Sequence, residues 1–170
     1  MNLFKLAAAQ TLILLLACSA ASAAEELIFS SNFNDESQAD VYGSKATYEK
    51  GRDGNCISVS SQGESTYIAI NIPAEKVAGK MLELSALVKA ENVSAKKKDW
   101  NGIKVQLYVE TADGEKSYPQ AGIPAGTFDW QEFSVVKKMP ANLKVARIVI
   151  GLEDVSGKAY FDNLNLKITE

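Results

Sequence analysis

The residues best suited to bind a polar ligand are aromatic and hydrogen-bonding side chains on the polar sides of alternating segments. Gln106 and Tyr108 share one such side, and Glu83 and Arg147 occupy polar positions in two other segments. Sugar rings stack their apolar C–H faces on aromatic planes, and their hydroxyl groups bond to amides, carboxylates and guanidinium groups. These residue types therefore fit a glycan site. The alternatives are that Tyr108 packs in a second layer and that Arg147 forms an ion pair on a strand face.

Two aromatic residues outside these segments are further candidates, and a third is expected to be structural. Trp100, in a polar loop, is either a platform for a sugar ring or a plug for one end of the fold. Tyr118, next to Pro119, is a second loop candidate. Trp130, in an Asp-Trp-Gln segment, is expected to pack structurally.

The composition argues against catalysis and against binding of nucleic acid. The chain of 170 residues has no histidine, which excludes Ser-His-Asp and Cys-His catalysis and histidine metal ligands. Glycoside hydrolysis needs two carboxylates on either side of one bond, and pairs such as Glu83 and Glu110 arise by chance among 21 acidic residues. Because 18 basic residues leave a net charge of -3, the chain has no basic excess to neutralise phosphates. We therefore predict a protein that is not an enzyme.

The first 24 residues have the three-part plan of a secretory signal peptide. Lys5 supplies the positive charge, Leu6–Ala17 the apolar stretch and Ser19–Ala24 the small residues before cleavage. The apolar stretch is too short to span a bilayer comfortably. The alternative is a bacterial lipobox ending at Cys18, which would carry a lipid anchor. We expect one mature domain, residues 25–170, that is secreted, periplasmic or at the cell surface.

Cys56 is the one cysteine of that mature domain, so an internal disulfide is excluded. It is either a reactive thiol or a small buried residue in a strand.

Alternation of apolar and polar residues dominates the mature domain, and helical periodicity is scarce. The clearest apolar faces are those of Leu82–Val88, Ile103–Val109, Phe133–Val135, Ala146–Leu152 and Leu164–Ile168. Earlier strands fit Leu27–Phe33, Ala46–Glu49, Cys56–Ser60 and Thr66–Ile72, while Glu75–Gly79 forms at most one helical turn. About eight to ten short strands separated by Gly and Asp turns predict an all-β fold, a two-sheet antiparallel β-sandwich of the jelly-roll type.

Several of these segments, in this order, carry a family resemblance. They are Ser31-Asn32-Phe33, Gly54–Val59, Gly79–Ala90, Gly126–Phe133 and the closing Gly157–Leu166 with its Phe-Asp-Asn sequence. The set resembles the carbohydrate-binding modules of families 4, 9 and 22, which are galactose-binding-like jelly rolls. The resemblance implies a non-catalytic domain that binds a glycan or polysaccharide on one sheet face or its loops. The alternative is an envelope structural or protein-interaction domain of the same fold.

The resemblance also implies a structural calcium ion. The family's ligands map onto Asn34, where the family has an acid, onto the Gly51–Asp53 loop and onto Asp162. Independently of the family, Asp162 has the parity of Leu164 and Leu166, which predicts that it faces inward. A buried carboxylate needs either a cation or several hydrogen-bond donors, so calcium and backbone amides are the two alternatives.

Overall fold

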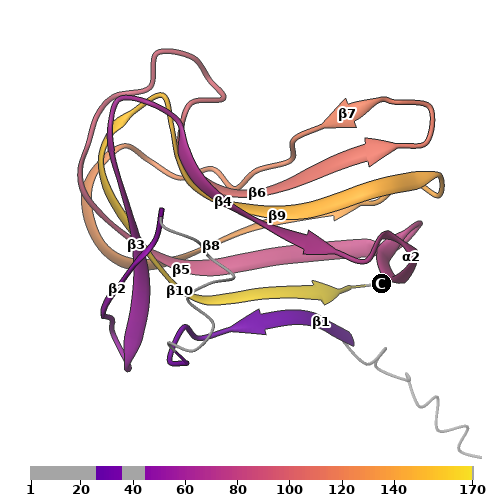
Figure 1. Cartoon of the computed structure of the whole chain (residues 1–170), viewed down its shortest axis with the longest axis horizontal. Coiled ribbons are helices and arrows are strands. Elements are labelled where there is room, and N and C mark those ends of the chain that lie inside the picture. Colours follow the sequence, from indigo (N-terminus) through magenta and orange to yellow (C-terminus); the bar gives the residue numbers. More distant parts are fainter. Residues whose placement is uncertain (1–25, 36–44, 170) are drawn as a thin grey trace, which may run out of the picture.

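The computed structural model describes residues 26–35 and 45–169, so the predicted signal peptide and Cys18 lie outside the described residues. Over these residues the chain forms ten strands and one single-turn helix, arranged as two facing antiparallel sheets (Figure 1). No helix among them is long and apolar enough to cross a membrane. The elements are β1 (Glu26–Ser31), β2 (Thr47–Lys50), β3 (Asn55–Gln62), β4 (Thr66–Ile72), α2 (Ala74–Val77), β5 (Met81–Val93), β6 (Gly102–Thr111), β7 (Lys116–Ser117), β8 (Gly126–Lys138), β9 (Leu143–Glu153) and β10 (Ser156–Ile168).

The two sheets differ in size and in strand order. The larger sheet has six strands in the order β2-β3-β10-β5-β8, and β1 also pairs with β10. Strand β10 is long enough for both neighbours, since β3 pairs with its first half and β1 with its second half. The smaller sheet has four strands in the order β4-β9-β6-β7. Sequence neighbours such as β5 and β6 therefore lie in different sheets.

The core lies between the sheets and is built by the predicted alternation. In β6 the inward residues Ile103, Val105, Leu107 and Val109 are buried, and the same holds for alternate residues of β4, β5 and β9. A strand with one buried face has its register fixed, because a slip of one residue would expose the whole apolar face. The prediction of an all-β, two-sheet antiparallel sandwich is confirmed.

Cys56 lies in β3 and is fully buried, with its thiol free. Burial, together with the charge of Asp162, raises the pKa of the Cys56 thiol to about 11. The thiol is therefore protonated at neutral pH. The structure favours the interpretation of Cys56 as a small buried residue over that of a reactive thiol.

Candidate functional site

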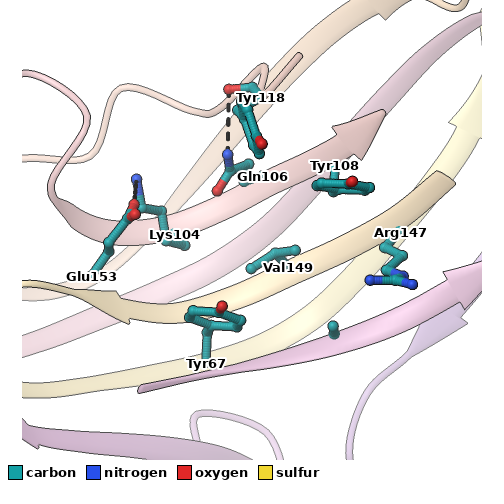
Figure 2. Close-up of a pocket in the computed structure, with 9 residues that line it drawn as sticks. Tyr67, Lys104, Gln106, Tyr108, Tyr118, Arg147, Val149 and Glu153 are labelled. Atoms are coloured by element: carbon teal, nitrogen blue, oxygen red, sulfur yellow. Dashed lines mark hydrogen bonds and ion pairs between the residues drawn. The ribbon is translucent and has the colours of Figure 1, made fainter. Parts of the chain in front are cut away.

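The outer face of the four-stranded sheet carries a groove of about 260 Å³ (Figure 2). Most of its lining comes from the outward-facing positions of three adjacent strands, because the alternate positions of those strands point into the core. We call it the sheet groove; its residues are Tyr67 and Ala69 of β4, Lys104, Gln106 and Tyr108 of β6, Arg147, Val149 and Glu153 of β9, and Tyr118 after β7.

Three tyrosines form the walls of the sheet groove, and small residues form its floor. Tyr67 is 43% exposed on one side, and Tyr118, at 55%, stands on the other. The ring of Tyr118 meets that of Tyr108 edge to face, with centroids 5.5 Å apart. Between the walls, Ala69 pairs with Val149 across the β4–β9 ladder. The result is a shallow apolar channel with aromatic sides.

Lys104 anchors one end of the sheet groove although only 1% of it is exposed. Its Nζ pairs with Glu153 Oε2 at 2.6 Å and donates to Gln120 Oε1 at 2.6 Å. It also donates to the carbonyl oxygen of Trp100. A buried ammonium group costs several kcal/mol unless paired and hydrogen-bonded. This one is fully engaged, and it connects three separate segments.

Tyr108 and Arg147 face each other across the β6–β9 ladder at the other end of the sheet groove. The guanidinium carbon of Arg147 lies 5.4 Å from the centre of the Tyr108 ring, and Arg147 Nε donates to Asn71 Oδ1 at 3.0 Å. The Tyr108 hydroxyl donates to Glu110 Oε2 at 2.7 Å. This hydrogen bond, followed by that of Lys144, lowers the pKa of Glu110, and it raises the pKa of Tyr108.

A second hollow of about 450 Å³ adjoins the sheet groove, and we call it the outer hollow. It shares Lys104, Gln106, Tyr118 and Glu153 with the sheet groove. Its distinctive wall is Trp100, which is 56% exposed and has Lys98 Nζ 5.0 Å from its ring centre. Together the two hollows make a continuous surface lined by aromatic residues along the sheet.

The structure brings most of the predicted binding residues together. Gln106, Tyr108 and Arg147 line the sheet groove, and Trp100 lines the outer hollow. Glu83 is the exception, and grouping it with them was wrong. It lies on β5 in the other sheet, where its carboxylate pairs with Lys167 Nζ at 3.2 Å. Alternation in the sequence shows which side of a strand is polar but not the sheet to which the strand belongs.

Sequence reasoning missed Tyr67, Lys104 and Glu153. Tyr67 and Lys104 occupy polar positions of segments predicted to be strands, so the alternation held a signal for them. Glu153 follows directly after the predicted segment Ala146–Leu152, at the end of β9. Trp130 lies on β8, away from the sheet groove, with its ring 6.4 Å from that of Tyr160. Its neighbourhood is that of a packing residue.

The residues predicted to bind calcium lie at the opposite sheet. Asp162 is buried, but the parity argument for it was wrong, because a register shift between Asp162 and Asn165 separates it from the alternation of Leu164. It alternates with the core residue Phe161 instead. Burial raises the pKa of Asp162, and the nearby charge of Asp53 raises it further, while its bond from the Asn163 N–H opposes both effects.

The oxygen atoms of Asn34, Asp53 and Asp162 fit a divalent cation in part. The carboxylates of Asp53 and Asp162 would supply hard oxygen ligands of the kind that calcium prefers, and the charge of Asp53 raises the pKa of Asp162. Asn34 Oδ1 accepts the Asn55 N–H at 2.7 Å, which leaves one lone pair for an ion. In the described part of the chain no three His, Cys, Asp or Glu side chains gather as a metal cluster. A cation here would therefore also need amide and carbonyl oxygens.

Comparison with solved structures places the fold. The chain matches the CBM22-1 xylan-binding domain from Paenibacillus barcinonensis with a TM-score of 0.58 and 12% identity, over 88% of this chain and 99% of that one. It matches the Clostridium thermocellum endo-1,4-beta-D-xylanase 10B, CBM22-1 and GH10 modules complexed with xylohexaose, with a TM-score of 0.60 and 13% identity. That match covers 85% of this chain but 29% of the longer one.

A family 16 carbohydrate-binding module gives a TM-score of 0.54 at 18% identity, over 74% of this chain and 86% of that one. No protein-family model and no curated protein matches the sequence. The fold is thus the jelly-roll sandwich seen in carbohydrate-binding modules of families 22 and 16, which confirms the fold that the sequence resemblance implied.

Proposed function

We propose that the protein is a non-catalytic glycan-binding domain and that the sheet groove, continued by the outer hollow, binds the sugar chain. The observation that carries this proposal is the convergence of three tyrosines on a shallow channel with hydrogen-bonding groups at both ends. Aromatic walls would hold the C–H faces of sugar rings, while Gln106 and Arg147 would bond to hydroxyl groups. Export by the predicted signal peptide would bring the domain to extracellular or envelope glycans.

The state of the carboxylates supports binding rather than hydrolysis. A glycosidase needs a carboxylic acid that stays protonated to act as general acid, usually through a raised pKa. In the sheet groove Glu153 is paired with Lys104, and the adjacent Glu110 has a lowered pKa because Tyr108 and Lys144 bond to it. Glu83, the other acid considered from the sequence, lies in the opposite sheet. These acids therefore do not supply a protonated acid and a base on either side of one glycosidic bond.

The two hollows together favour an extended ligand. Arg147 and Glu153 are six residues apart on β9, which corresponds to roughly 20 Å along an extended strand. Trp100 adds a further aromatic wall in the outer hollow, which Glu153 also lines. We therefore expect oligosaccharides to bind more tightly than single sugars, and we expect the affinity to rise with chain length.

Tyr118→Ala is expected to weaken glycan binding by roughly 1–3 kcal/mol, or about ten- to hundred-fold, by analogy with stacking on other flat ligands. Tyr118 lines both hollows and is largely exposed, so the melting temperature should change little. A glycan array would identify the ligand, and titration calorimetry would measure the loss. Tyr118→Phe keeps the ring and should bind normally. Unchanged affinity in Tyr118→Ala would contradict the proposed site, and no binding to any glycan would favour the structural or protein-interaction alternative.

We also propose that calcium binds between Asp53 and Asp162 and stabilises the domain. An ion that binds only the folded state contributes about 2.7 kcal/mol at 100-fold over its dissociation constant. Wild type should therefore melt several degrees higher with calcium than with chelator. Asp162→Asn should abolish that difference and melt no lower than wild type in chelator, because it removes a buried charge while an amide oxygen can still accept the Asn163 N–H. Identical wild-type curves in both conditions would exclude the ion.

A further inference from the structure

Arg147 carries the one guanidinium group at the sheet groove, and its charge lacks an acidic partner. Its Nε donates to the neutral side chain of Asn71, and its carbon lies 5.4 Å from the centre of the Tyr108 ring. No Asp or Glu in residues 26–35 and 45–169 forms an ion pair with it. The terminal Nη groups of Arg147 are thus left as donors in the lining of the sheet groove (Figure 2).

The acids near the sheet groove are already engaged elsewhere. Glu110 accepts from the Tyr108 hydroxyl at 2.7 Å and pairs with Lys144 at 3.3 Å. Glu153 pairs with Lys104 at 2.6 Å, some six residues along β9 from Arg147. The positive charge of Arg147 is therefore not cancelled locally, although the chain as a whole has a net charge of -3.

A second cation stands over the opposite wall. Lys45 Nζ lies 5.4 Å from the centre of the Tyr67 ring, and among the described residues no carboxylate forms an ion pair with it. A cation thus lies over the ring of Tyr67 on one side of the sheet groove and over the ring of Tyr108 on the other. Polar groups that only met sugar hydroxyls would need no net charge, whereas two uncancelled cations favour an anionic ligand.

We propose that the sheet groove selects glycans that contain a uronic acid and that Arg147 binds the carboxylate. This inference rests on the proposed function and specifies its substrate class. A guanidinium is a planar fork of donors that matches a carboxylate in a bidentate, charge-assisted pair. Asn71 occupies Nε and Tyr108 packs against the guanidinium, so its orientation is fixed before the ligand arrives. Such preorganisation lowers the entropy cost of binding.

The test compares acidic polysaccharides with their carboxyl-reduced forms, which keep the same backbone but carry a neutral CH₂OH group. Suitable probes are polygalacturonate, alginate, glucuronoxylan and hyaluronan fragments of equal length. Wild type should bind at least one native form roughly ten- to hundred-fold more tightly than its reduced form at low salt. The preference should shrink as ionic strength rises, because salt screens an exposed charge pair.

Arg147→Gln should weaken binding of the native form far more than binding of the reduced form, and so abolish the preference. Arg147→Lys should keep only part of the preference for the native form, because lysine keeps the charge but lacks the planar, bidentate donors of the guanidinium group. Lys137→Gln, on β8 of the other sheet, removes the same charge and should retain the full preference. Thermal melts of each variant would verify that all of them fold.

Each of the other outcomes would contradict the proposed selectivity for a uronic acid. Equal binding of native and reduced forms, or equal weakening of both by Arg147→Gln, would overturn the acidic selectivity while leaving the proposed glycan binding intact. Binding to neutral glycans alone would do the same. Discrimination confined to a sulfated glycan and its desulfated form would overturn the assignment to a carboxylate. No binding to any of these probes or to a full glycan array would overturn both proposals together.

Discussion

Replacing Lys104 with methionine is expected to lower the free energy of unfolding by about 2–4 kcal/mol, or the melting temperature by roughly 6–12 °C. The change removes one ammonium group from three acceptors, namely the Glu153 carboxylate, the Gln120 amide oxygen and the Trp100 carbonyl. Removing one partner of a buried ion pair destabilises a protein by more than the intact pair stabilises it, because the remaining charge stays partly desolvated. Thermal and urea unfolding monitored by circular dichroism would measure the loss.

The same substitution should also weaken glycan binding although Lys104 need not touch the sugar. Its Nζ holds the Trp100 backbone and Gln120, and these positions set the walls of the outer hollow. In Lys104→Met with Glu153→Gln the leftover charge is gone, so part of the lost stability should return while the binding defect persists. Lys137→Met, an exposed lysine on β8, should stay within about 0.5 kcal/mol of wild type. A stability of Lys104→Met equal to that of wild type would refute the buried network.

The fold could be predicted because the period-2 pattern is strong and one face of each strand is buried. The segment Thr66–Ile72 was predicted with the bounds that the structure gives it, and Pro73 explains its end, since proline cannot donate to a ladder. Other strand ends differ by a few residues, where pairing with a neighbour extends a strand beyond its apolar run. The single turn of α2 also agrees with the prediction for Glu75–Gly79.

The candidate site could be predicted only as far as strand parity reaches. Parity placed Gln106, Tyr108 and Arg147 on polar sides, and the β6–β9 ladder then brings them together. It could not reveal that β5, which carries Glu83, joins the other sheet, since strand order depends on long-range pairing.

Asp162 is buried as expected, but the parity argument for it was wrong for a different reason. Asn163 adopts a left-handed backbone conformation with φ 46°, and the resulting irregularity shifts the register of β10. The sequence gives only a weak signal of this irregularity, because asparagine also occurs at ordinary strand ends and in turns.

The position of the sheet groove depends on one glycine that strand parity alone does not identify as special. Gly151 lies on the outer side of β9, directly opposite Tyr67 in the β4–β9 ladder. Its φ is +144°, which residues with a side chain rarely adopt. A Cβ at this position would meet the Thr66 carbonyl oxygen and lie 2.6 Å from the Tyr67 Cα. The close approach of β4 that sets the Tyr67 wall is therefore possible only with glycine.

Gly151→Ala is accordingly expected to destabilise the protein by about 3–5 kcal/mol, the sum of backbone strain and overpacking against an unyielding main chain. Because the clash is with β4 itself, relief requires β4 to move and carry Tyr67 away from the sheet groove, so glycan affinity should fall as well. Gly63→Ala is the matched control. Gly63 has a similar φ of +128°, but a Cβ there has no atom within 4 Å. It should lose only the strain, about 1–3 kcal/mol, and keep full affinity. Equal losses of stability in the two variants, with binding intact in both, would show that the approach of β4 to Gly151 does not shape the site.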